Sequence, residues 1–126
     1  MTIMEIGKKL IIEKLVTETD TAAYYGSGLL HVFATPAMIA LMEQSAHLLA
    51  KFSLPETQDT VGIEVNVKHT RATPMGTKVY AEAELILIEG KKLTFSVVAF
   101  DEQGEIGKGT HMRYIINPAK YMHNIS

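Results

Sequence analysis

The segment that decides the fold runs from Thr35 to Lys51 and reads TPAMIALMEQSAHLLAK. Its first two residues suit a helix start, because the Thr35 hydroxyl can accept a backbone N–H as an N-cap and Pro36 fits the first helical position. Ala, Leu and Met, which are strong helix formers, fill most of the remainder. The run is apolar on most sides, a pattern typical of a buried helix. Pro55 follows just beyond its end.

Strand patterns surround this helix. Residues 6–18 alternate imperfectly and predict a first strand, and residues 19–34 include the turn-rich sequence YYGSG and predict a loop. After the helix, alternation and hairpin turns predict four more strands, at residues 61–71, 77–89, 93–100 and 105–116. The tail, residues 117–126, shows little pattern.

The order of these elements favours one architecture. Tight turns join three of the last four strands, so those strands should be antiparallel neighbours. One sheet can cover a helix that is apolar on most sides only by curving around it. We therefore predict an α+β protein with the hot-dog fold, a curved antiparallel sheet wrapped around a long central helix. With 126 residues and no linker or repeat, we expect a single domain over residues 1–126.

The composition argues against several classes of protein. The chain has no cysteine, which removes disulfides, thiolate catalysis and cysteine-type zinc sites. A net charge of -2 with scattered lysines is unlike a nucleic-acid-binding protein. Met1–Lys9 carries charges and no long apolar run, so we expect neither a signal peptide nor a membrane span. The sequence thus predicts a soluble, cytoplasmic protein without a metal, a cofactor, a membrane partner or a nucleic-acid partner.

Glu43 opens a short polar block, Glu43-Gln44-Ser45, inside the apolar helix. An ionised carboxylate buried without partners costs several kcal/mol. We therefore expect Glu43 to be paired, hydrogen-bonded, shifted in pKa or facing a cavity. A structural hydrogen bond or an exposed contact at a helix edge is the alternative.

His69 lies near the end of a strand whose odd positions are apolar: Val61, Ile63, Val65 and Val67. A period of two puts His69 on that face, which should look at the helix. A single histidine there can be a satisfied core residue. A carboxylate and an imidazole on facing surfaces can also form an acid–base pair that works near pH 7.

Thr35 has two interpretations as well. It can be a plain N-cap, or it can mark a helix N-terminus whose free N–H groups hold a developing oxyanion. Eight residues separate Thr35 from Glu43, about 12 Å along a helix, which is too far for a direct hydrogen bond. Whether the histidine or a helix end from a partner subunit bridges this gap stays open.

Three stretches resemble fluoroacetyl-CoA thioesterase-like hot-dog proteins. His31–Glu43 resembles the family's helix motif, Val67–Gly76 its following strand and turn, and Ile106–Arg113 its last strand. The similarity runs in order over nearly the whole chain. It implies a thioesterase that acts on an acyl-CoA and forms a homodimer, with assembly beyond a dimer left open. In this family the active sites lie at the subunit interface, where groups from two chains can converge.

The resemblance also implies roles for particular residues. The family's catalytic threonine, glutamate and histidine fall on Thr35, Glu43 and His69, and its substrate-contacting glycine and arginine fall on Gly62 and Arg113. These groups would cleave the thioester into the free acid and CoA, with either Thr35 or a water as nucleophile. For Arg113 a surface ion pair is the alternative.

The remaining histidines are not spaced as a metal site, and we interpret each as surface or structural: His31, His47, His111 and His123. Gly107 and Gly109 lie in a strand pattern and do not open a helix, so a close backbone approach or a bulge explains them better than a phosphate-binding loop.

One segment departs from the family. The lid-like stretch before the helix is shortened here to residues 24–30, which implies a broader or different short acyl group rather than selectivity for fluoroacetyl. Two other functions stay open. The chain could be a hot-dog hydratase or dehydratase, although the Asp–His pair of those enzymes is not seen. It could also be a non-catalytic module that binds acyl-CoA or another small apolar ligand.

Overall fold

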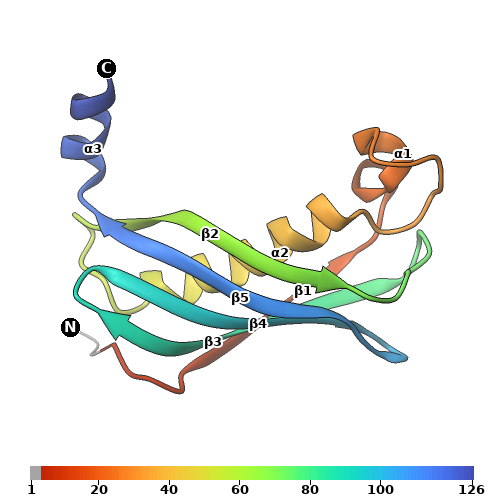
Figure 1. The fold of residues 1–126 in the computed structure, drawn as a ribbon, viewed down its shortest axis with the longest axis horizontal. Helices are drawn as coiled ribbons and strands as arrows, with labels where there is room; N and C mark the ends of the chain where they lie inside the picture. Colours follow the sequence, from red (N-terminus) through yellow and green to blue (C-terminus); the bar gives the residue numbers. More distant parts are fainter. Residues whose placement is uncertain (1–3) are drawn as a thin grey trace.

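A computed structural model describes residues 4–126. Met1–Ile3, the first part of the segment in which we expect neither a signal peptide nor a membrane span, lie outside the described residues. The elements in chain order are β1 (Lys9–Leu15), the 3-10 turn η1 (Glu18–Asp20), α1 (Ala22–Tyr25), α2 (Thr35–Lys51), β2 (Asp59–His69), β3 (Lys78–Glu89), β4 (Lys92–Asp101), β5 (Gly104–Ile116) and α3 (Pro118–Ile125). The five strands form one antiparallel sheet in the order β1-β3-β4-β5-β2, and α2 lies across it (Figure 1). This confirms the predicted hot-dog arrangement.

The core fills the space between α2 and the sheet. One face of α2 is fully buried against side chains of the central strands: Met38, Leu41, Met42, Ala46 and Leu49 meet Val79, Ala81, Phe95 and Val97. The prediction that α2 is buried all round is wrong for this single chain. The five strands cover only one side of the helix, so Pro36, Gln44 and Leu48 are exposed.

β2 contains a bulge that changes which residues face the helix. The register with β5 skips Ile63, since Gly62 pairs with Arg113 and Glu64 pairs with Met112. An extra residue reverses the alternation of a strand. The single apolar face predicted for residues 61–67 is therefore wrong, and Ile63 is 52% exposed.

His69 lies beyond this bulge and lines a hollow with Phe33 of the core. Before the bulge, Thr60 is buried and Gly62 faces Glu43. The register with β5 continues without a break from Val65 to His69, so the predicted inward position of His69 is confirmed, although the bulge lies between it and Val61.

The strand glycines allow close packing, as the sequence predicts. A Cβ at Gly107 would lie 2.6 Å from Met38 Sδ, so only glycine lets α2 approach β5 this closely. A Cβ at Gly109 would overlap the backbone of Asn66 on the neighbouring strand.

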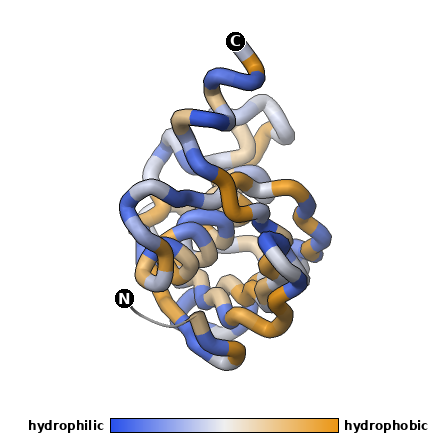
Figure 2. Tube along the Cα trace, turned by 90° about the vertical axis from the view of Figure 1, so that its left-hand side faces the viewer, coloured by the Kyte–Doolittle hydropathy of each residue, from blue (hydrophilic) through white to orange (hydrophobic). Residues whose placement is uncertain are grey.

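Two segments hold structure that the sequence pattern does not predict. In the loop before α2, isolated antiparallel β-bridges pair Thr21 with Phe33 and Val32 with Pro74. At the end of the chain, the Asn117 side chain accepts the Lys120 N–H and begins α3, which projects away from the sheet (Figures 1 and 2). Within residues 4–126, none of the helices has the length and apolar character needed to span a membrane.

Candidate active site

Thr35 and His69 form a hydrogen-bonded pair at the start of α2. The prediction that Thr35 caps the helix is wrong: Ala34 occupies the N-cap position, and Thr35 is the first helical residue. Freed from capping, Thr35 Oγ1 lies 2.8 Å from His69 Nδ1 at the end of β2. Thr35 is exposed and His69 is half-buried, so solvent and ligands can reach the hydroxyl.

The surroundings of His69 favour its neutral form. Burial lowers the pKa of His69 below its ordinary value, while the backbone of Arg71 opposes the shift. The Phe33 ring lies edge-on to the imidazole at 6.4 Å. A neutral imidazole with a free Nδ1 lone pair can accept the Thr35 proton. Thr35 and His69 can therefore act as a nucleophile and its general base.

Glu43, Gly62 and Arg113 come together farther along α2. Glu43 Oε2 lies 3.7 Å from Arg113 Nη1, in an ion pair that spans α2 and β5. A Cβ at Gly62 would lie 2.7 Å from the same carboxylate oxygen, so the missing side chain makes room for Glu43. The Glu43 side chain is 40% exposed and is therefore both paired and open to solvent.

Arg113 is buried, so its ion pair with Glu43 is not the surface ion pair considered for it. Its Nε donates to Thr60 Oγ1 at 2.7 Å, and its Nη2 donates to the Thr60 carbonyl at 3.0 Å. Burial lowers the pKa of Arg113, and the carboxylates of Glu43 and Asp59 oppose the shift. A guanidinium stays charged under all ordinary conditions.

His111 belongs to this cluster, and sequence reasoning did not assign it there. It is 1% exposed, and its Nε2 lies 4.0 Å from Glu43 Oε2 and 3.2 Å from Arg113 Nη1. Of the two alternatives given for His111, surface or structural, its burial excludes the first. Its odd position in β5, two residues before Arg113, is the signal that could have found it, because both side chains then face α2.

Within one chain these two groups stay apart. Thr35 and His69 line one hollow of about 260 Å³, whereas Glu43 and Arg113 line another of about 360 Å³. The carboxylate–imidazole pair expected between Glu43 and His69 is not formed inside the single chain, where the imidazole nearest Glu43 is that of His111.

His47 lies one turn beyond Glu43 on α2, and its Nε2 is 2.7 Å from Asp59 Oδ1. Both side chains are half-exposed, and His47 lines the same hollow as Glu43. Among residues 4–126, no group of three or more histidine, cysteine, aspartate and glutamate side chains is arranged to hold a metal ion.

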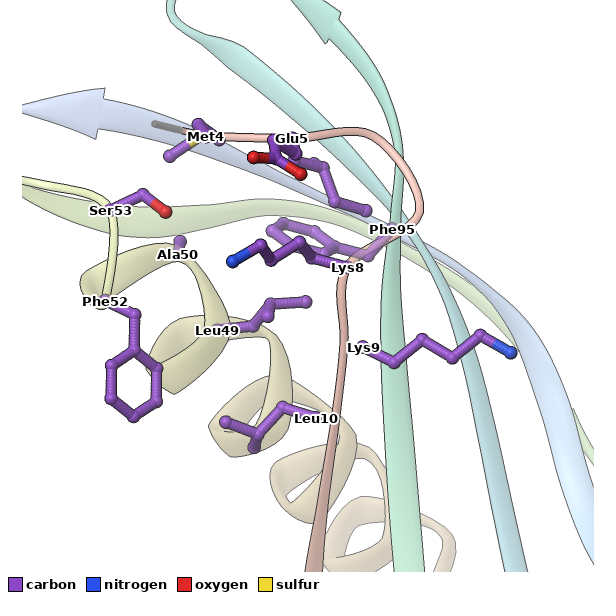
Figure 3. A pocket seen from close by; sticks show the side chains of 11 residues that line it. Met4, Glu5, Lys8, Lys9, Leu10, Leu49, Ala50, Phe52, Ser53 and Phe95 are labelled. Atoms are coloured by element: carbon purple, nitrogen blue, oxygen red, sulfur yellow. The ribbon is translucent and has the colours of Figure 1, made fainter. Parts of the chain in front are cut away.

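A third hollow, of about 250 Å³, lies toward the other end of α2. Leu10, Leu49 and Phe95 form much of its wall, and Glu5 and Lys8 come from the segment before β1 (Figure 3). It has neither a nucleophile paired with a base nor an imidazole in its lining, so it offers no counterpart to the Thr35–His69 pair.

Known proteins share both sequence and fold with this chain. The sequence model of the family described as fluoroacetyl-CoA-specific thioesterase matches residues 16–119. A fluoroacetyl-CoA thioesterase from Streptantibioticus cattleyicolor is 40% identical over 90 residues, which cover 71% of this chain and 65% of the relative. The match thus spans slightly less than two thirds of that relative's length.

Solved structures share the fold closely. A fluoroacetyl-CoA thioesterase superposes with a TM-score of 0.91 at 32% identity, covering 97% of this chain and 95% of that chain. A complex of a mutant of that enzyme with fluoroacetate and CoA gives a TM-score of 0.88 at 32% identity, over 94% and 99% of the two chains. A thioesterase superfamily member from Thermus thermophilus gives 0.90 at 27% identity, over 99% and 93%. This chain therefore belongs to the fluoroacetyl-CoA-specific thioesterase family.

Proposed function

We propose that this protein hydrolyses the thioester of a short acyl-CoA to the free acid and CoA, as a homodimer. The observation that carries the proposal is the 2.8 Å contact between Thr35 Oγ1 and His69 Nδ1. A hydroxyl beside a neutral imidazole is the arrangement that acyl transfer requires. Membership in a thioesterase family and the similarity to an enzyme solved with CoA support the same chemistry.

The dimer is proposed from the free edge of β2. β2 ends the sheet, and it exposes the apolar Ile63 and Val65, which are 52% and 37% exposed. Long apolar edge strands of this kind pair readily with another chain. Two copies of β2 can pair antiparallel about a two-fold axis, as isologous dimers do.

Such a pairing would join the two halves of the site. If the axis passes through Val65 or Asn66, the partner's His69 comes within one residue, roughly 3.4 Å, of the position opposite Gly62. Thr35 and His69 of one subunit would then face Glu43 and Arg113 of the other. The gap of about 12 Å between Thr35 and Glu43 along one helix would no longer separate them.

The reaction can then be written with the groups at hand. His69 accepts a proton from the Thr35 hydroxyl, or from a water held at that place, as the oxygen attacks the thioester carbonyl. The free N–H groups at the start of α2 stabilise the oxyanion. The C–S bond breaks, and CoA leaves as a thiolate that takes up the proton from His69. With water as the nucleophile this step yields the free acid directly. With Thr35 as the nucleophile it leaves an acyl ester on Thr35, which a water deprotonated by His69 then hydrolyses to the free acid, returning the proton to the Thr35 oxygen. Arg113 and Gly62 hold the acyl group, and Glu43 stabilises the charged imidazole.

Release of free thiol from a panel of short, medium, branched and fluorinated acyl-CoAs tests the activity. We expect turnover of short chains, lost in Glu43→Ala and His69→Ala and kept in His123→Ala, a histidine on the exposed α3. Absence of thiol release from every acyl-CoA would overturn the proposal. Binding without turnover would favour an acyl-CoA-binding module, and loss of the enoyl absorbance of crotonyl-CoA would favour a hydratase.

Mixing two inactive variants tests the shared site. A dimer of one Glu43→Ala subunit and one His69→Ala subunit contains one intact composite site, whereas two sites confined to single chains would both be broken. Equal mixing after dissociation should therefore restore about a quarter of the wild-type rate. No recovery in mixtures shown to contain the heterodimer would refute the composite site. The cytoplasmic location and any assembly beyond a dimer stay predictions.

A further inference from the structure

We propose that His111 is a positioning residue whose single neutral tautomer fixes the Arg113 guanidinium in the acyl pocket. The inference rests on the proposed function, because it gives His111 a role in that same site. His111 lies at the centre of the buried half of the site, in contact with β2, α2 and β5 residues. No step of the proposed reaction uses it directly.

The hydrogen bonds of His111 determine its tautomer. Its Nδ1 lies 2.8 Å from the Glu64 carbonyl, which can only accept, so Nδ1 carries the proton. In the neutral ring Nε2 then holds a lone pair. Arg113 Nη1 lies 3.2 Å from Nε2 and can only donate, so this contact requires the same tautomer. Two independent partners thus select one form of the ring.

The bulge in β2 makes this arrangement possible. It lies between Gly62 and Glu64, which both touch the cluster from that strand, as Thr60 does ahead of the bulge. Gly62 leaves the space that the Glu43 carboxylate fills, and Glu64 presents its carbonyl to His111. One irregularity in the strand therefore supports both sides of the pocket.

Arg113 is held on three sides as a result. Thr60 takes two of its N–H groups, through Oγ1 and through the backbone carbonyl, and His111 takes a third. Nη1 remains 3.7 Å from Glu43 Oε2, beyond hydrogen-bond distance. A second N–H of Nη1 is thus left for an acceptor atom of the acyl group, in an orientation that His111 sets.

Burial and the Arg113 cation lower the pKa of His111, the Glu64 carbonyl and the Glu43 carboxylate oppose the shift, and the net effect favours the neutral ring. Four groups face the imidazole. They are the cation of Arg113 on β5, the Glu43 carboxylate on α2, the Glu64 carbonyl on β2, and the Phe95 ring on β4 at 6.3 Å. A proton on Nε2 would point an N–H at the N–H of Arg113 and break that contact. Arg113 would then lose its third anchor and its fixed orientation.

Nitrogen-detected NMR of the histidine rings tests the tautomer without any substrate. We expect His111 in the full-length protein to show a protonated Nδ1 and an unprotonated Nε2 at neutral pH, while exposed His123 serves as the internal control. A protonated Nε2 would overturn the proposal. This result does not depend on catalysis, so it separates failure of this inference from failure of the proposed thioesterase activity.

Two substitutions test the positioning role in the acyl-CoA assay. His111→Leu removes the acceptor for Arg113, and we expect KM for a short acyl-CoA to rise roughly 10-fold, the effect of losing one hydrogen bond to a charged group. His111→Gln keeps an acceptor and should recover most of that loss, and His123→Gln should match the wild type. Equal KM values for a folded His111→Leu and the wild type would overturn the proposal. If His111→Leu does not fold, failure of a folded His111→Gln to keep KM within a few-fold of wild type would do so.

Discussion

The two halves of the site differ in how the protein holds them. Thr35 and His69 meet through one hydrogen bond at an exposed helix start. Arg113, by contrast, is buried and bound by both polar groups of Thr60 and by His111. The half proposed to do the chemistry is thus accessible and held by a single hydrogen bond, whereas the half proposed to bind the acyl group is fixed by several. We call the second group, with Glu43, Gly62, His111 and Arg113, the rigid half. Substitutions in the first half should therefore change rate, and those in the second should change affinity and stability as well.

The largest effect is expected in the exposed half. His69→Ala removes the base that accepts the Thr35 proton, so kcat should fall about 10²- to 10⁴-fold. KM should change little, because the acyl-binding groups are untouched. Steady-state kinetics with a short acyl-CoA measure both constants. An equal fall in kcat for His31→Ala, which lies in the loop before α2, would show that the effect does not depend on this pair.

Gly62→Ala should give the next largest effect, in the rigid half. The new Cβ would lie 2.7 Å from Glu43 Oε2 and 3.2 Å from the His111 ring, so the cluster must shift. Overpacking of this kind costs about 1–3 kcal/mol of stability, and we expect both a lower Tm and a higher KM.

Gly28→Ala is the matched control for that substitution. Its Cβ would meet only the Ala22 side chain, at an ordinary 3.5 Å, and its backbone is not in a left-handed conformation. Its Tm should stay near the wild-type value. If Gly62→Ala and Gly28→Ala were equally stable, the close packing of Glu43 against β2 would be contradicted.

Local features of the fold are predicted from the sequence, and features that depend on packing between elements are not. The sequence predicts a helix that begins at Pro36, capped by Thr35, and ends at Lys51. In the structure α2 begins one residue earlier and ends at the same residue, because helix propensity and period are local properties. The five strands are likewise predicted in order. The bulge at Ile63 is not predicted, because it depends on how Gly62 packs against α2, and the alternating pattern of β2 conceals it.

The sequence also predicts the residues of the site better than the contacts between them. The helix and strand patterns single out Thr35, Glu43 and His69, and the resemblance to a family adds their catalytic roles together with Gly62 and Arg113. The structure gathers three of these five residues in one place and two in another. The spacing of His111 from Arg113 puts both side chains on one face of β5, but its contact with Glu43 depends on how α2 packs against that strand, which the sequence pattern does not identify. α3 was missed because its side chains are largely exposed and follow no core pattern, although Asn117-Pro118 is a recognisable helix start.

Lowering the pH should affect stability through both halves. Burial lowers the pKa of His69 and of His111 below 6.5, so between the folded and unfolded pKa values the unfolded chain binds more protons. The free energy of unfolding then rises with pH. Stability should be fully present above about pH 6.5 and decline below it as the pH approaches the folded pKa values.

Urea denaturation at a series of pH values measures this decline. His111→Gln should make the decline shallower, because one of the two contributing groups is gone. His123→Gln, in the exposed α3, should leave the slope unchanged. A slope identical in His111→Gln and the wild type would contradict a buried neutral His111.

The smallest effect is expected for His47→Gln, because His47 lies next to the rigid half but makes none of the contacts that hold Arg113. His47 lies one turn beyond Glu43 on α2, but its contact with Asp59 is half-exposed. Ion pairs that solvent reaches contribute about 0–1 kcal/mol, so the Tm should fall by only a few degrees. The KM for a short acyl-CoA should stay within about two-fold, because no group that holds Arg113 changes. A rise in KM as large as that of His111→Leu would extend the rigid half along α2 to His47, and calorimetry together with steady-state kinetics distinguishes the two cases.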